Sequence, residues 1–159
     1  MNVYLKILFT IIVVAAAGYV IFYLADVLLA KKTPQNQNNQ VCFKQNCFAV
    51  ELAKNYAEQE KGLMNRTQLD SNKGMLFIFN SEGVYPFWMK NTLIPLDMIW
   101  MDANNKIVFI AQNVQPCKTL ICPVTTPTGK AKYVLEINAG ISSDIGLKVG
   151  DVATIETSN

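Results

Sequence analysis

The residues from Phe87 to Asp97 read FWMKNTLIPLD, and this stretch decides how the strands around it are built. Among its aromatic and aliphatic residues it carries a cation, an amide, a hydroxyl and a carboxylate: Lys90, Asn91, Thr92 and Asp97. An unpaired charge in an apolar interior is very costly, so these groups must lie at a solvated edge or find buried partners. The stretch therefore predicts two strands joined by a tightly specified bend, but it names no reaction.

Apolar runs on both sides of this stretch predict further strands separated by turn-forming residues. The expected strands are 41–43, 48–52, 74–79, 87–90, 96–101, 106–114, 133–137 and 152–156. A helix is expected after Asn55, which forms a capping-box pattern with Glu58 and precedes Gly62, and a second over 139–145. The sum predicts an α+β domain, compact and mostly antiparallel, barrel-like or a sandwich, with two short helices.

The amino-terminal part of the chain has no charged residue from Ile7 to Ala25. With the apolar residues that follow, the run is about 23 residues long, enough for a helix that crosses a bilayer. We expect a membrane anchor over 1–30, a flexible polar linker over 31–40 and a folded domain over 41–159. The alternative is a cleaved signal peptide with its small-residue site at Ala15–Ala17.

All four cysteines lie beyond the predicted anchor, as two C-x4-C pairs: Cys42, Cys47, Cys117 and Cys122. Paired cysteines after an export signal indicate disulfides in an oxidising compartment. Three pairings are possible, and the two local ones are favoured because each spacing spans a short polar or turn-forming segment. A four-thiolate zinc site is the weaker alternative. The expected location is the cytoplasmic membrane, single-pass, with the carboxy-terminal domain periplasmic or extracellular.

Composition argues against several classes of function. The formal charge is +2 and no basic cluster is present, so nucleic acid is not an expected partner. The chain has no histidine, no phosphate-binding loop and no series of metal ligands, so we expect no cofactor, no metal and, on balance, no enzymatic activity. The methionines are expected to fill the core rather than to bind Cu(I).

Six motifs between Glu51 and about Ile155 resemble, in order, those of domain-of-unknown-function family 192. They are Gly62-Leu63-Met64 with Arg66, Gly74-Met75-Leu76-Phe77, Trp88-Met89-Lys90-Asn91-Thr92, Pro95-Leu96-Asp97, Tyr133-Val134-Leu135-Glu136 and Lys148-Val149-Gly150-Asp151. The resemblance implies a small β-rich domain, commonly exported or membrane-anchored in prokaryotes, with no established activity. It supplies no catalytic residues to carry over.

The candidate ligand-binding residues are polar or aromatic side chains in or beside the apolar motifs: Arg66, Trp88, Lys90, Asn91, Thr92, Asp97 and Glu136. One interpretation is architectural, a buried ion-pair network in which Arg66 pairs with Asp97. The other is a cleft where Arg66 and Lys90 attract an anionic or polyhydroxy ligand, Asn91 and Asp97 hydrogen-bond it, and Trp88 floors a sugar site.

Three functions remain open at this point. The leading one is a membrane-anchored extracytoplasmic binding or accessory domain without catalysis, whose partner is an envelope polysaccharide or a membrane protein. The second is a polysaccharide-acting enzyme that uses Asp97 and Glu136, which requires their carboxyl groups to lie about 5 to 10 Å apart across one groove. The third is an accessory subunit of a larger membrane complex, held through small residues such as Gly18.

Overall fold

The computed structural model describes residues 2, 4, 19 and 39–158. The chain divides into two compact units, 1–36 and 37–159. Nearly all of the predicted anchor and linker lies outside the described residues, so those two predictions stay predictions. No helix among the described residues is long and apolar enough to cross a bilayer.

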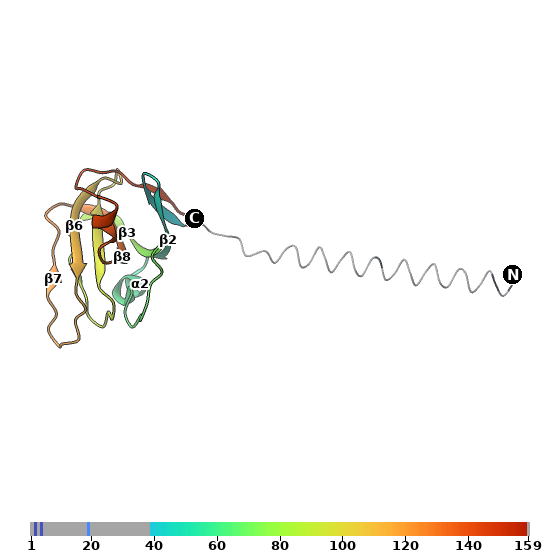
Figure 1. Cartoon of the computed structure of the whole chain (residues 1–159), viewed down its shortest axis with the longest axis horizontal. Helices are drawn as coiled ribbons and strands as arrows, with labels where there is room; N and C mark the ends of the chain where they lie inside the picture. Colours follow the sequence, from blue (N-terminus) through green and yellow to red (C-terminus); the bar gives the residue numbers. More distant parts are fainter. Residues whose placement is uncertain (1, 3, 5–18, 20–38, 159) are drawn as a thin grey trace. The chain divides into compact units, whose positions relative to one another are not determined.

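Strands dominate residues 39–158, with two short helices between them (Figure 1). In chain order the elements are β1 (Gln40–Phe43), β2 (Asn46–Ala53), α2 (Tyr56–Lys61), β3 (Lys73–Gly83), β4 (Phe87–Trp88), β5 (Leu96–Met101), β6 (Ile107–Val114), β7 (Val124–Thr125), β8 (Ala131–Asn138), α3 (Ile141–Asp144) and β9 (Thr154–Glu156). The α+β prediction is confirmed, as are seven of the expected strands in outline.

Seven strands form one sheet in the order β6-β5-β8-β3-β2-β1-β9, and its two ends meet. The backbone N–H of Ile107 donates to the carbonyl of Asp151 at 2.8 Å, and that of Ala153 donates to the carbonyl of Asn105 at 2.9 Å. These bonds join the segment before β9 to the start of β6. The sheet therefore curls into a barrel, which leaves no long unpaired edge between these strands.

Pairing in the sheet is antiparallel except between β2 and β3, which run parallel. The reason is α2, which carries the chain back along the sheet as the crossover of a β-α-β unit. Its predicted capping box is confirmed: the Asn55 side chain accepts from the N–H of Glu58, and the Glu58 carboxylate accepts from the N–H of Asn55. Gly62 ends the helix at φ 46°, a backbone region that favours glycine.

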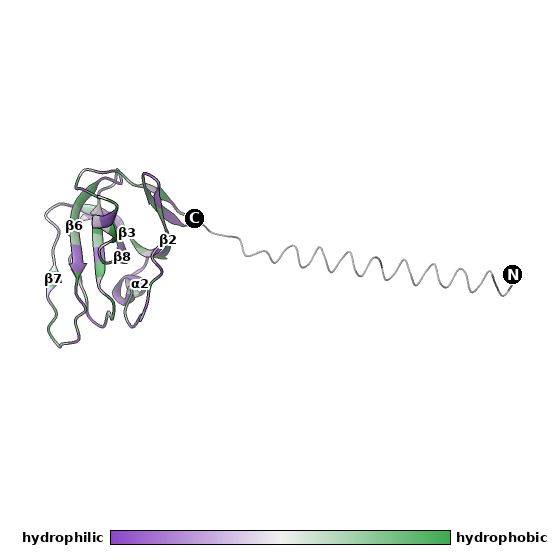
Figure 2. Ribbon diagram, in the orientation of Figure 1, coloured by the Kyte–Doolittle hydropathy of each residue, from purple (hydrophilic) through white to green (hydrophobic). Residues whose placement is uncertain are grey.

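The two faces of the sheet bury two separate hydrophobic clusters, because side chains alternate along each strand. On β5, Ile99 and Met101 belong to the cluster inside the barrel. Leu96, Met98 and Trp100 belong to a second cluster on the outer face, where β4, β7 and the loops around them cover the sheet. Helix α2 has no buried residue and appears mostly hydrophilic in Figure 2.

Two local predictions need correction. The strand expected over 87–90 is only Phe87–Trp88, paired with β7, which the sequence did not reveal. The helix expected over 139–145 is the single turn α3, which begins after Gly140 at φ 91°. The prediction of a mostly antiparallel sheet is confirmed, since β2 and β3 are the one parallel pair among the strands described.

The cysteines form the two local disulfides, Cys42–Cys47 and Cys117–Cys122. The first links β1 to β2 across their hairpin, where the two residues are paired in register. The second closes the loop between β6 and β7 and packs into the outer cluster. Paired disulfides of this kind indicate an oxidising location outside the cytoplasm.

Candidate functional site

A cleft of about 170 Å³ opens on the outer face of the sheet, between the end of α2, the far half of β3 and the segment that contains β4. It is lined by Gln59, Glu60, Lys61, Gly62, Leu63, Met64, Phe77, Phe79, Tyr85, Pro86, Phe87, Trp88, Thr92 and Glu136. Of the seven candidate residues, the structure places Trp88, Thr92 and Glu136 in this lining.

Glu136 is the buried carboxyl group of the cleft. On β8 it lies in register between Met75 of β3 and Met98 of β5, so thioether side chains flank it on both sides. It is 4 % exposed, and none of the described residues donates a hydrogen bond to its carboxyl group. Burial raises the pKa of Glu136 to about 8, because removal from water disfavours the charged form.

Gly62 lets the chain after α2 pass directly over this carboxyl group. A Cβ at position 62 would lie 3.2 Å from Phe77 Cζ and 3.9 Å from Glu136 Oε2. A side chain here would therefore project into the cleft and press on Phe77. The combination of φ 46° and this close approach explains why glycine stands at the mouth of the cleft.

Aromatic rings form much of the cleft wall. Phe77 and Phe87 meet edge to face with ring centroids 4.8 Å apart, and Phe79 stacks on Tyr85 with centroids 3.6 Å apart. Trp88 is 45 % exposed at the mouth. The ammonium nitrogen of Lys90 lies 5.1 Å from the centroid of the Trp88 ring, a cation–π geometry.

Several polar side chains of the lining already donate their protons to backbone carbonyls. The Gln59 amide donates to the carbonyls of Ile78 at 2.9 Å and Ala53 at 3.3 Å. The Tyr85 hydroxyl donates to Ser81 at 2.7 Å, and the Thr92 hydroxyl faces the Lys90 carbonyl at 3.5 Å. These donors hold the walls in place, and they leave the carboxyl group of Glu136 without one.

Asp97 lies on the other face of the sheet, so it neither lines the cleft nor shares a groove with Glu136, as two of its predicted roles require. It pairs in register with Ile137, the neighbour of Glu136, so the two carboxylates point to opposite faces. Asp97 is fully buried, and its oxygens accept from the backbone N–H groups of Asn113 at 2.8 Å, Gly140 at 3.1 Å and Ser142 at 2.8 Å. It therefore fixes the start of α3, and it cannot share a groove with Glu136.

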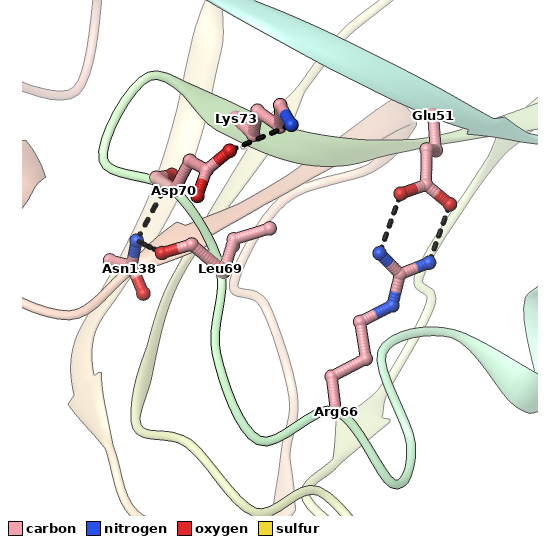
Figure 3. Close-up of polar contacts among 6 residues, drawn as sticks. All are labelled: Glu51, Arg66, Leu69, Asp70, Lys73 and Asn138. Atoms are coloured by element: carbon pink, nitrogen blue, oxygen red, sulfur yellow. Dashed lines mark hydrogen bonds and ion pairs between the residues drawn. The ribbon is translucent and has the colours of Figure 1, made fainter.

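Arg66 pairs with Glu51 rather than with Asp97, through two parallel hydrogen bonds from its guanidinium (Figure 3). The pair holds the loop after α2 against β2. The side-chain amide of Asn138 fastens the same loop by donating to the carbonyls of Leu69 at 2.8 Å and Asp70 at 3.2 Å (Figure 3). The predicted buried network around Arg66 and Asp97 was wrong, and Arg66 does not line the cleft.

Asn91 is exposed and supports the cleft wall through its backbone. Its φ of 55° makes the bend between β4 and β5, a conformation that asparagine tolerates better than most residues. Its N–H donates to the carbonyl of Cys117, and its carbonyl accepts from the N–H of Asn65. The bend thus joins the disulfide loop to the loop after α2 and positions Thr92 between them.

Most of the remaining lining escaped the sequence-based selection. Leu63, Phe77, Tyr85 and Phe87 look like ordinary core residues when the sequence is read alone. The available signals were the aromatic residues grouped between Phe77 and Trp88 and the Gly62-Leu63-Met64 motif after a capped helix. Neither signal shows that the two segments face each other.

A family model matches residues 38–155 of the chain, that of domain-of-unknown-function family 192, described as an uncharacterised ACR. The chain belongs to this family. The matched range contains β1 to β8, the residues that line the cleft and all four cysteines. No curated protein matches the chain.

Two solved structures resemble this member of the family. One is a protein of unknown function from Novosphingobium aromaticivorans, 37 % identical, with a TM-score of 0.67 over 72 % of this chain and 83 % of that one. The other is from Sinorhizobium meliloti, described provisionally as a transcription regulator, 32 % identical, with a TM-score of 0.67 over 73 % of this chain and 90 % of that one. Both likenesses support the fold.

Proposed function

We propose that the domain is a binding module, and that part of its ligand enters the cleft above Glu136. The observation that carries this proposal is a carboxyl group that is 4 % exposed, faces the cleft and receives no hydrogen bond from the described residues. Among the described residues no fully enclosed side-chain oxygen lacks a hydrogen bond, so the oxygens of Glu136 are reached through the cleft, where water or a ligand can donate to them. The retention of this carboxyl group in a cleft is readily explained if a ligand completes its hydrogen bonds.

Catalysis by Asp97 and Glu136 loses its geometric basis, because the two carboxylates lie on opposite faces of the sheet. Attraction of an anion by Arg66 loses its basis as well, since Glu51 engages the guanidinium. What the cleft offers is an aromatic wall, a hydroxyl and a buried acid, which is a set suited to holding a group in place.

The proposal includes the setting in which the module works. The uncharged run from Ile7 to Ala25 supports a membrane anchor, and the polar segment that follows supports a tether of about ten residues. The two disulfides support an extracytoplasmic position for the domain. A domain tethered in this way would meet envelope polysaccharides and neighbouring membrane proteins within a few tens of Å.

A second candidate is an accessory subunit of a membrane complex, and the disulfide loop favours it. Leu120 and Ile121 stand at the tip of this loop, 100 % and 88 % exposed. Val124 and Trp88, which pair across β7 and β4, continue the apolar surface toward the mouth of the cleft. A protein partner that covers this surface would also contact Trp88 at the mouth of the cleft.

A thermal-shift screen of the full-length protein in mild detergent tests the leading proposal. A ligand that binds only the folded state must raise the melting temperature. The screen should contain envelope sugars, amines, carboxylates and metal ions, with Trp88→Phe as a variant that alters the cleft mouth. A ligand that stabilises the wild type and binds Trp88→Phe more weakly supports a function in this cleft. If no compound class stabilises the protein, weight moves to the subunit function, which co-purification in mild detergent tests.

A further inference from the structure

We infer that the cleft binds a primary ammonium group on a short apolar stem, with the ammonium donating hydrogen bonds to the carboxylate of Glu136. This inference rests on the proposed binding function and names its ligand class. The source of the ammonium is either a free amine or a lysine side chain of a partner, since both present the same chemistry.

Among the described residues, the walls of the cleft supply no hydrogen-bond donor to the carboxyl group of Glu136. Gln59 and Tyr85 already donate their side-chain protons to backbone carbonyls of β2 and β3. The carboxyl group of Glu136 has two oxygens that receive no hydrogen bond from the described residues. Once Glu136 has given up its proton it only accepts, so a ligand that brings several donors complements the carboxylate better than one that brings acceptors. An ammonium brings three donors and no acceptor.

The surroundings of Glu136 favour a positively charged ligand. Glu136 lies between Met75 and Met98, in surroundings that oppose a lone negative charge. A cation placed against the carboxyl group compensates this charge, and the group then gives up its proton. The aromatic wall adds to the attraction, because ring faces favour cations. The ammonium nitrogen of Lys90 already lies over the Trp88 ring, 5.1 Å from its centroid, so a cation–π contact forms at the mouth of the cleft.

The volume of the cleft matches a small alkylammonium group. At about 30 Å³ for each water-sized group, a cleft of about 170 Å³ holds roughly five or six heavy atoms. An ammonium on a four-carbon stem has five, and it matches the end of a lysine side chain. The stem would lie against Leu63, Phe77 and Phe87, which line the cleft.

Four other titratable side chains lie near the cleft and could contribute to a pH dependence of ligand binding. Glu60 and Lys61 face it from the last turn of α2, Tyr85 faces it from the segment after β3, and Lys90 lies over Trp88. Glu60 and Lys61 are exposed, of opposite charge, and at the rim. Across the sheet, Glu136 lies in register with Met75 of β3 and Met98 of β5, and beyond Met75 the same row reaches Glu51 of β2, which is paired with Arg66.

The test is calorimetric titration of the full-length protein in mild detergent with n-butylammonium chloride at neutral pH. The neutral match is 1-butanol, and a lysine blocked at both ends probes the side-chain source. We expect n-butylammonium to bind at least about tenfold more tightly than 1-butanol. Repeated in buffers of different ionisation enthalpy, the titration should show release of about one proton for each amine bound, because Glu136 ionises on binding. Tighter binding of the blocked lysine would identify a protein partner as the source.

Glu136→Gln supplies the decisive variant, because it keeps the shape of the side chain and removes the charge. We expect it to lose the proton release and at least about tenfold in amine affinity, whereas Glu156→Gln on β9 should leave both unchanged. Equal binding of 1-butanol and n-butylammonium, or unchanged amine affinity in Glu136→Gln, would overturn the ammonium inference. If a neutral ligand raises the melting temperature while amines do not, the binding function survives and this inference fails. If neither does, both fail.

Discussion

Asp97 and Glu136 are two buried carboxyl groups on neighbouring strands, and they differ in their hydrogen-bond partners. Asp97 faces the barrel interior and accepts three backbone hydrogen bonds, from Asn113, Gly140 and Ser142. Glu136 faces the cleft and accepts none from the described residues. Burial alone therefore does not reveal a role, whereas the presence or absence of partners separates a group that builds the fold from one available to a ligand.

The largest expected effect comes from removing the carboxylate that is fully paired. Asp97→Asn replaces one accepting oxygen with a donor group that faces backbone N–H groups, so it should lower the free energy of unfolding by about 3 to 5 kcal/mol. Chemical denaturation measures this change. Glu136→Gln is the matched control, and it should cost far less because no hydrogen bond to the described residues is lost. Equal destabilisation of the two variants would contradict the claim that Asp97 stabilises the fold through its hydrogen bonds and Glu136 does not.

The second prediction concerns the pH dependence of stability. The unfolded chain ionises Glu136 near 4.5, while the folded chain keeps its proton up to about pH 8. Between these values the folded state binds more protons, so the free energy of unfolding should fall as the pH rises and level off above about 8. The total is on the order of a few kcal/mol. Urea titrations below, within and above this window should show the decline in the wild type, and Glu136→Gln should flatten it. A slope that persists in the variant would assign the effect to another group.

The contrast between the two carboxylates also shows where sequence reasoning stops. Period-two alternation places Asp97 with Ile99 and Glu136 with Val134 on one face of their own strands. Which face of β8 matches which face of β5 depends on their register, and the register is set by packing between residues far apart in the chain. Sequence therefore revealed two unusual acids but not that they point in opposite directions.

Local signals fared better, because their partners lie within a few residues. The capping box of α2 and the two short-range disulfides were predictable in this way. The β4–β7 pairing and the cleft were not, since they bring together segments separated by loops with no regular pattern. Arg66 pairs with Glu51 rather than with Asp97 for the same reason, because the tertiary structure determines which acid lies within reach of the guanidinium.

The two disulfides offer a third prediction of intermediate size. Each closes a loop of the same length, so replacing either pair with serine should cost about 2 kcal/mol by chain entropy. Only Cys117–Cys122 joins the wall of the cleft, because Cys117 bonds through its backbone to Met89 and Asn91 beside Thr92. Its loss should weaken binding of n-butylammonium, whereas loss of Cys42–Cys47 should not. Calorimetry on both variants, under conditions where each is folded, makes the comparison. Equal weakening of amine binding in the two variants would show that the disulfide loop has no specific role in shaping the cleft.

The smallest expected effect belongs to Arg66, the predicted site residue that the fold directs elsewhere. Its side chain and that of Glu51 are 33 % and 55 % exposed, so solvent screening reduces the value of their ion pair, and Arg66→Ala should cost about 0.5 to 1 kcal/mol. The hydrogen bond from Arg66 lowers the pKa of Glu51, so this contribution should disappear as the pH falls through that lowered value. Lys73→Ala, which breaks the exposed pair with Asp70 near the same loop, is the matched control. Denaturation gives the stabilities, and calorimetry with n-butylammonium gives the role: if Arg66→Ala, still folded, weakens amine binding as much as Glu136→Gln does, Arg66 belongs to the binding site after all.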